Sequence, residues 1–166
     1  MRYINATRPR VVFCENVKNL LTHDKDQSAW QLMNMRKLIE TNFVCVREGG
    51  KLRDIVDAIK QSKRNLFPVV DEAGHFLGLI VMDDIRKIIF QPELYDKLTV
   101  RELMMTFKDD DIVHSSESLS DVVNRFQLSN RYNLIVVDDD GHYLGFLSRA
   151  NTFSAYRRFI SETSED

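Results

Sequence analysis

The chain of 166 residues carries 23 lysines and arginines against 25 aspartates and glutamates, which gives a formal net charge of −2. This balance argues against nucleic acid as a partner, because a sequence-independent binder needs a basic excess to neutralise phosphates. Hydrophobic residues make up 43%, as in globular proteins, and no apolar run approaches the roughly 20 residues of a membrane span. The length allows one domain or two small halves.

The first 34 residues precede the part of the chain that repeats. Residues 1–15 are basic and are expected to form a connector. A helix is predicted to begin near 20–26, where Thr22 is a candidate N-cap. Its apolar face, which we expect to pack on the core, consists of Trp30, Met33, Leu38 and Ile39.

An internal repeat with an offset of 67 residues organises the rest of the chain. Residues 52–80 align without a gap with 119–147, and roughly a dozen of about thirty positions are identical. The repeat predicts a first domain at 35–96, a second at 97–160 and a disordered tail at 161–166.

Each copy predicts the same series of elements. In the first copy, apolar residues at helical spacing run from Leu52 to Ile59 and predict a helix. A strand at 67–70, a turn that ends in Gly74, a second strand and a helix start at Asp83 follow. The second copy repeats the helix at 119–126, the strand at 134–137, the turn at 138–141 and the helix start at 150.

Residues that often carry catalysis have no catalytic spacing here. Cys14 and Cys45 lie outside any zinc-binding pattern, and the apolar run around Cys45 predicts that it is buried. His75 and His142 each follow a glycine in a predicted hairpin turn. The acidic run 138–140 could hold a metal ion, but a solvated turn explains it more simply. The sequence therefore predicts a protein that is not an enzyme and needs no metal or cofactor.

The repeated strand–helix–strand–strand–helix unit, with Phe67-Pro68-Val69-Val70-Asp71, a Gly-ended turn and a Gly-apolar-apolar strand, resembles the cystathionine-β-synthase (CBS) domain. The resemblance covers roughly residues 35–158. It implies a mixed α/β (α+β) fold, a tandem CBS pair or Bateman module, in which two βαββα units pack through their sheets with pseudo-twofold symmetry. It also implies two clefts that hold ATP, ADP or AMP.

A narrower likeness concerns 20–26, 64–71, 83–86 and 92–96, which are similar to the cytoplasmic tail of bacterial CLC-type chloride channels and transporters. This likeness implies a soluble piece of an integral membrane protein, on the cytoplasmic side of the inner (cell) membrane. The implied partners are a second copy, in a homodimer, and the membrane-embedded CLC transport domain of the same polypeptide. The basic leader would connect to the last membrane helix.

The family's ribose motif, Gly-apolar-apolar-Ser/Thr-x-x-Asp, is split between the copies. Its carboxylate accepts hydrogen bonds from both ribose hydroxyls, and its hydroxyl helps to bind ribose or phosphate. The first copy keeps Asp84 but has Val81 at the hydroxyl position, and the second keeps Ser148 but has Asn151 at the acid position. Loss of one charge-assisted hydrogen bond costs roughly 1.5–3 kcal/mol, so neither copy matches the full pattern. Asp84 could also simply cap a helix.

The resemblance assigns candidate nucleotide-binding residues to the two clefts. One cleft would pair Asp84 with Arg131, Tyr132, Asn133 and Ile135. The other would pair Ser148 and Asn151 with Arg64, Asn65, Phe67 and Val44. Arg64 and Arg131 could meet phosphates, or could be exposed arginines at helix ends. The CLC likeness favours the cleft with Asn151, the chemistry favours Asp84, and both stay open.

These features predict a regulatory CBS pair of a CLC-type channel or transporter, which mediates dimer contacts and senses an adenine nucleotide. One alternative is a ligand-free structural module that stabilises a dimer, which the split motifs favour. Another is a CBS-pair sensor that stands alone or belongs to another transporter or enzyme.

Overall fold

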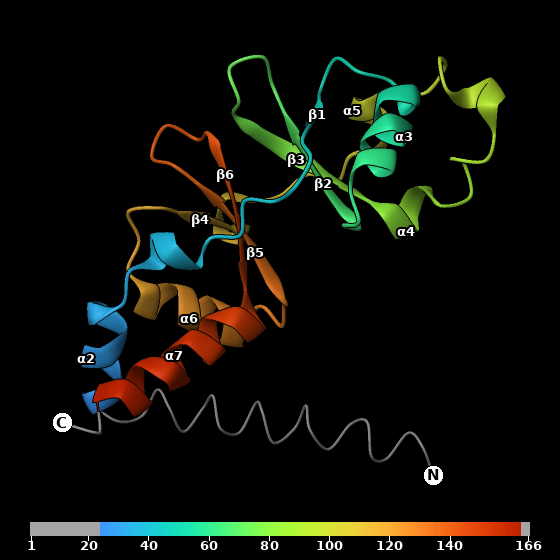
Figure 1. The fold of residues 1–166 in the computed structure, drawn as a ribbon. Helices are drawn as coiled ribbons and strands as arrows, with labels where there is room; N and C mark the ends of the chain where they lie inside the picture. The colour runs from blue at the N-terminus through green and yellow to red at the C-terminus, as the bar shows by residue number, and fades with distance from the viewer. Residues whose placement is uncertain (1–23, 164–166) are drawn as a thin grey trace, which may run out of the picture. The chain divides into compact units, whose positions relative to one another are not determined.

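The structure, a computed structural model, describes residues 24–163. The predicted basic connector, the Thr22 cap and residues 164–166 of the predicted tail lie outside the described residues. The chain forms two compact units, which do not coincide with the two repeats (Figure 1). Of the described residues, unit 1 comprises 24–38, Glu117–Leu134 and 147–163, and unit 2 comprises Ile39–Ser116 and Ile135–Phe146.

The first repeat lies in unit 2 and follows the predicted order of elements. They are β1 (Val46–Arg47), α3 (Leu52–Gln61), β2 (Leu66–Val70), β3 (Phe76–Val81) and α4 (Met82–Ile85). The strands form a sheet in the order β1-β2-β3, in which β1 is parallel and β3 is antiparallel to β2. Short helical turns follow at η2 (Pro92–Leu94) and α5 (Val100–Leu103).

The second repeat supplies the same elements, but they are divided between the units. They are η3 (Asp109–Asp111), β4 (Ile112–His114), α6 (Leu119–Leu128), β5 (Asn133–Val137), β6 (Tyr143–Ser148) and α7 (Arg149–Thr163). The second sheet has the order β4-β5-β6, with β4 parallel to β5. The division between the units passes through β5 and β6.

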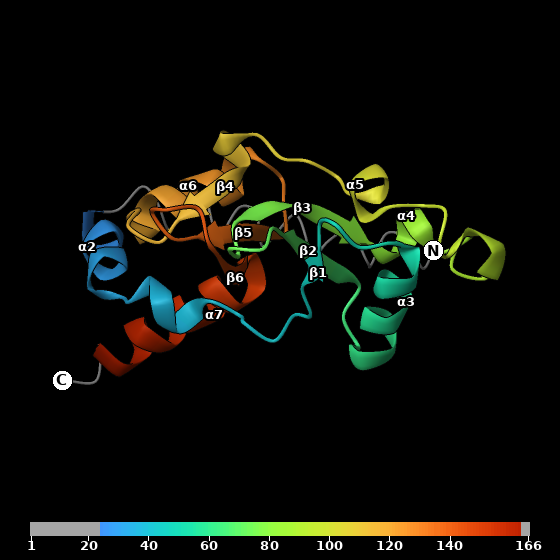
Figure 2. The ribbon, with the colours of Figure 1, turned by 90° about the horizontal axis from the view of Figure 1, so that it is seen from above.

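The helix α3 forms where the apolar stripe predicts it. Leu52 and Ile55 are fully buried on its inner face, in one cluster with Phe67 and Ile80 of the adjoining strands. Figure 2 shows α3 beside β1 and β2. Asp54 accepts a hydrogen bond from the main-chain N–H of Lys51 at 2.7 Å, which satisfies a donor at the helix start. The buried stripe and the cap together fix this helix on the sheet.

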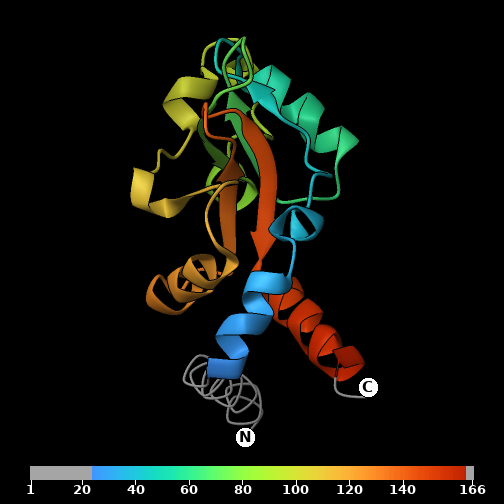
Figure 3. The same cartoon turned by 90° about the vertical axis from the view of Figure 1, so that its left-hand side faces the viewer.

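In unit 1, the helices pack around Trp30, a residue from outside the repeat. The helix α2 (Asp24–Leu32) contacts both α6 and α7 (Figure 3). Trp30 is fully buried; its ring stacks on Tyr156 at 4.1 Å between centroids and meets Phe153 edge-on at 5.7 Å. The predicted apolar face is thus confirmed at Trp30, whereas Met33 lies beyond the helix end and is only half-buried.

The helix start predicted at Asp83 is confirmed by α4, which ends at Ile85. Two other sequence expectations differ from the structure. The helix α7 continues to Thr163, so residues 161–163, predicted to begin the tail, are helical. Cys45, predicted to be buried, is exposed, because it lies one residue before β1 and Val46 takes the buried side of that short strand.

The two repeats share a core within unit 2. Leu79 of β3 packs with Ile135, Val137 and Phe146 of the second repeat, and all four side chains are buried. This cluster joins the inner faces of the two small sheets, as the CBS resemblance implies. The first repeat also has a separate core cluster of its own, which contains Leu52, Ile55, Phe67 and Ile80.

A segment near the start of each domain, before its first strand, pairs with the third strand of the other repeat. The main chain of Glu40 exchanges two hydrogen bonds with Phe146, at 2.8 and 3.0 Å, and that of Met105 exchanges two with Leu79, at 2.8 and 2.9 Å. We call these two pairings the crossed bridges. They explain Gly145 and Gly78, since a Cβ would stand 2.4 Å from the Glu40 carbonyl oxygen at the first and 2.6 Å from that of Met105 at the second.

Candidate functional site

The residues of the split ribose motif lie where a strand turns into a helix. Asp84 is exposed in the first turn of α4. Ser148 ends β6, and its hydroxyl accepts a hydrogen bond from the main-chain N–H of Asn151, which is exposed, at 3.3 Å. The helix after Ser148 has 15 residues and the one at Asp84 has four. Only α7 is long enough for a sizeable helix dipole to favour an anion at its start.

The residues before β2 and β5 occupy equivalent positions. The carbonyl oxygen of Asn65 accepts a hydrogen bond from the N–H of Met82 at 2.9 Å, and that of Tyr132 accepts one from Arg149 at 2.8 Å. The side chains of Asn65, Tyr132 and Asn133 are exposed. These side chains, rather than the two bonded carbonyl groups, are thus the groups most open to a ligand.

Two candidate residues lie in the hydrophobic core. Phe67 is fully buried among the apolar residues of the first repeat, and Ile135 is 3% exposed in the shared core. Val44 is half-buried and packs against the first of these clusters. Phe67 and Ile135 can therefore offer a ligand only their main chain, and their side chains serve packing.

The arginine of the first repeat is held by its own surroundings. The Arg64 guanidinium donates hydrogen bonds to Asn42 Oδ1 at 2.7 Å and to Glu40 Oε2 at 3.2 Å. It also lies over the ring of Phe43, 4.7 Å from the centroid. Arg131, its counterpart, is half-buried, and its main-chain N–H donates to Ser129 Oγ at 3.4 Å. Arg64 is thus not simply an exposed helix-end arginine.

The candidate residues fall into both units. Unit 2 contains Val44, Arg64, Asn65, Phe67, Asp84 and Ile135. Unit 1 contains Arg131, Tyr132, Asn133, Ser148 and Asn151. Each predicted cleft draws on both units and stays a prediction.

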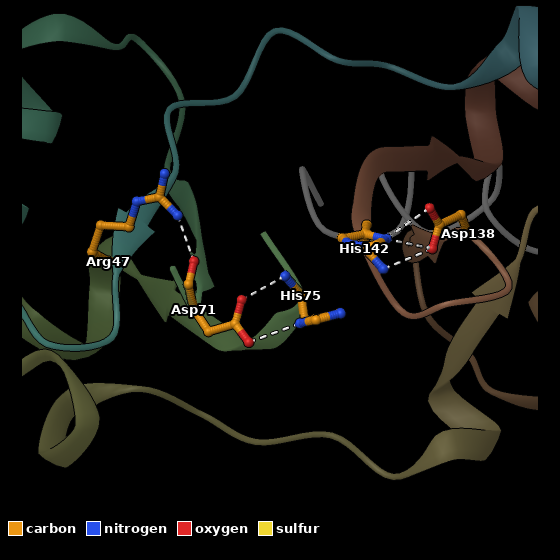
Figure 4. A network of polar contacts seen from close by, with 5 residues as sticks. All are labelled: Arg47, Asp71, His75, Asp138 and His142. Atoms are coloured by element: carbon orange, nitrogen blue, oxygen red, sulfur yellow. Dashed lines mark hydrogen bonds and ion pairs between the residues drawn. The ribbon is translucent and has the colours of Figure 1, made fainter. Parts of the chain in front are cut away.

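The two predicted hairpin turns meet in unit 2. Gly74 and Gly141 have φ of 97° and 91°, the left-handed conformation expected of them. The rings of His75 and His142 stack with centroids 4.4 Å apart (Figure 4). Main-chain bonds from Phe76 to Gly141 and from Tyr143 to Gly74, both 3.0 Å, join the turns. The Gly-His pair that is identical in both repeats therefore lies where the two repeats contact each other.

Each histidine is oriented by an aspartate four residues earlier. His75 Nδ1 lies 2.8 Å from Asp71 Oδ2, and His142 Nδ1 lies 3.0 Å from Asp138 Oδ2 (Figure 4). The hydrogen bond from the His75 side chain, aided by one from its main chain, lowers the pKa of Asp71 to about 2. Arg47 donates to the carbonyl oxygen of Asp71. The carboxylates thus fix both rings.

The acidic turn of the second repeat brings three donors together. Asp138, Asp140 and His142 offer ligand atoms within 4.8 Å of one another. However, Asp138 Oδ1 already accepts the main-chain N–H groups of Asp140, at 3.0 Å, and His142, at 2.8 Å. These bonds are those of an Asx-type turn, so the solvated-turn interpretation explains the run.

Sequence reasoning missed the surroundings of Arg64. Glu40, Asn42 and Phe43 precede the aligned part of the repeat, and Glu40 lies 24 positions before Arg64. Their only sequence signal is an acid and an amide next to an aromatic residue, which is too common to indicate a site.

The fold and these positions define a class of protein: two βαββα repeats whose sheets share a buried cluster, with a polar helix start after each third strand. The sequence matches the CBS domain family at residues 35–91 and again at 100–157. The chain belongs to the CBS domain family, as a tandem pair.

Solved structures of CBS proteins are similar in fold. A CBS domain-containing protein of unknown function from Bacillus anthracis has a TM-score of 0.65 and 18% identity, over 80% of this chain and 98% of that one. The CBS domain of a bacterial CNNM/CorC family Mg²⁺ transporter in complex with ATP has 0.62 and 15%, over 77% and 89%. CBSX2 in complex with AMP has 0.59 and 20%, over 76% and 98%. No curated protein matches the chain significantly.

Among the residues that the structure describes, no helix combines the length and the apolar character that crossing a membrane requires.

Proposed function

We propose that this CBS pair is a regulatory module that binds an adenine nucleotide. The observation that carries the proposal is the placement of the motif residues: Asp84, Ser148 and Asn151 all lie where a third strand passes into a helix. The carboxylate of Asp84, the amide oxygen of Asn151 and the hydroxyl of Ser148 can each accept a hydrogen bond from a ribose hydroxyl. The ATP and AMP complexes of the similar CBS structures support the same ligand class.

We further propose that the module is the cytoplasmic tail of a CLC-type chloride channel or transporter, and that it forms a homodimer next to the transport domain. The similarity of segments 20–26 and 64–71 to such tails supports this assignment. A nucleotide would regulate transport only by binding two conformational states unequally. Reading the gene upstream of residue 1 tests the assignment: many membrane spans support it, and their absence contradicts it.

Calorimetric titration of the chain with ATP, ADP and AMP tests nucleotide binding. We expect a saturable signal. If the first copy binds ribose, Asp84→Ala should lower the affinity for the nucleotide about tenfold or more, because a charge-assisted hydrogen bond is lost. Flat traces at millimolar nucleotide would overturn the proposal.

Restoring the motif provides a sharper test than removing it. Asn151→Asp returns the acid to the second copy, beside Ser148, and Val81→Thr returns the hydroxyl to the first, before Asp84. Each restored bond should raise affinity about tenfold in the copy that binds. Ala150→Asp, one residue earlier on the same helix, is the control and should leave affinity unchanged.

The split motif also favours a second candidate, a ligand-free module that stabilises a dimer. In that case the melting temperature stays the same with and without nucleotide, for wild type and for the Asp84→Ala, Asn151→Ala double variant. Sedimentation would show a dimer in both proteins. A nucleotide-induced rise in melting temperature that Asp84→Ala or Asn151→Ala abolishes contradicts this candidate.

A further inference from the structure

Glu40 forms an ion pair with the Arg64 guanidinium. The two side chains are 3.2 Å apart between Oε2 and the guanidinium nitrogen, and they expose 20% and 39% of their surfaces. Asn42 and the face of Phe43 hold the same guanidinium from other directions. An ion pair that is partly shielded from water keeps more of its Coulomb energy than an exposed one.

The main chain that bears Glu40 is fixed. Its N–H and carbonyl groups both bond to Phe146 in the first of the crossed bridges. The carbonyl oxygen also lies so close to Gly145 that no side chain fits there. The carboxylate consequently stays near Arg64, rather than moving away with a loose segment when an anion approaches.

The second repeat has no carboxylate at the matching position. The crossed bridges make Met105 the counterpart of Glu40, since each pairs with the third strand of the other repeat. A thioether carries no charge that could neutralise an arginine or repel a phosphate. Glu40 therefore has no acidic counterpart at the bridged position of the second repeat.

We propose that Glu40 is a specificity-determining residue, which offsets the charge of Arg64 and so selects a ligand with little phosphate charge over a nucleoside triphosphate. The inference rests on the proposed function and adds to it that Arg64 meets the phosphates of the bound nucleotide, as the CBS resemblance implies. A triphosphate must either displace the Glu40 carboxylate from Arg64 or bind next to it, where the two negative groups repel each other. Adenosine, without phosphate, meets neither cost, and AMP meets less of it.

The test compares Glu40→Gln with wild type by calorimetry, with ATP, AMP and adenosine. The glutamine keeps a hydrogen-bond acceptor for Arg64 and removes only the charge. We expect the affinity for ATP to rise about tenfold, that for AMP about threefold and that for adenosine less than twofold. The gain for ATP should shrink at about 0.5 M salt, where the Debye length is only a few ångströms. Arg64→Gln in the Glu40→Gln background should remove the gain.

Glu48→Gln is the matched control, because Glu48 is another carboxylate of unit 2 that pairs with an arginine, Arg101. It should leave the ratio of ATP to adenosine affinity as in wild type, and thermal unfolding checks that every variant is folded. If ligands bind but Glu40→Gln changes this ratio less than twofold, the inference about Glu40 is wrong and the proposed function stands. If no adenine ligand binds wild type or Glu40→Gln, both are overturned.

Discussion

Gly145 lies where two distant chain segments come closest in unit 2. A Cβ there would stand 2.4 Å from the Glu40 carbonyl oxygen and 2.6 Å from Ile39 Cγ2, so alanine would force the bridge between Glu40 and Phe146 apart. We expect Gly145→Ala to destabilise the protein by about 1–3 kcal/mol. Urea unfolding measures this. Gly49→Ala is the control, since nothing lies within 4 Å of its added carbon; equal effects would contradict the explanation.

The Asp71 carboxylate makes folding stability depend on acid pH. Hydrogen bonds from His75 hold its pKa at about 2, below the ordinary 3.8. A carboxyl with a lowered pKa stabilises the folded state fully above about pH 4, and this contribution is lost as the pH falls toward 2. The free energy of unfolding, measured with urea between pH 2 and 7, should therefore fall less steeply toward acid pH for Asp71→Asn than for wild type.

Glu72→Gln, an exposed neighbour in the same turn, controls for the loss of one negative charge. An Asp71→Asn profile parallel to that of wild type through this range would show that the His75 contact does not matter to stability.

Some residues of the candidate site could be predicted from the sequence, and others could not. The motif positions Asp84, Ser148 and Asn151 could be predicted, because a local pattern marks a strand-to-helix junction. The burial of Phe67 and the contact between Glu40 and Arg64 could not. Both depend on side chains brought together from remote parts of the chain, and no local spacing records such contacts.

At the scale of elements, α2 shows how a helix from outside the repeat is held. Its Trp30 is fully buried between Phe153 and Tyr156. We expect Trp30→Ala to cost about 3–5 kcal/mol, as aromatic truncations in cores do. Leu32→Ala on the same helix is the control, since Leu32 is 75% exposed; it should cost less than about 0.5 kcal/mol. Chemical denaturation compares the two, and a similar cost for both would contradict this packing.

Elements with a strong local pattern in the sequence were predicted well. The stripes at Leu52 and Leu119 predict α3 and α6, because helical spacing is a local property. The start of α4 at Met82 also lies within one residue of the predicted helix start at Asp83.

At the scale of the whole molecule, the main consequence of the repeat is that the two copies share a buried cluster of apolar side chains. The hairpin of the second repeat contributes Ile135, Val137 and Phe146 to a cluster with Leu79 of the first. Expressed alone, residues 97–160 would expose these side chains, so we expect no cooperative thermal transition by circular dichroism. The described range 24–163 should unfold cooperatively. A sharp transition of the isolated repeat would contradict the dependence.

The crossed bridges also give the chain a mechanical property. Tension applied to the segment before Glu40 reaches Phe146, near the other end of the sequence, through two main-chain hydrogen bonds, without passing first through the intervening residues. A matching pair at Met105 and Leu79 transmits tension to the first repeat from the beginning of the second. In a single-molecule pulling experiment the two repeats should consequently rupture together, as one force peak, rather than open like beads on a string.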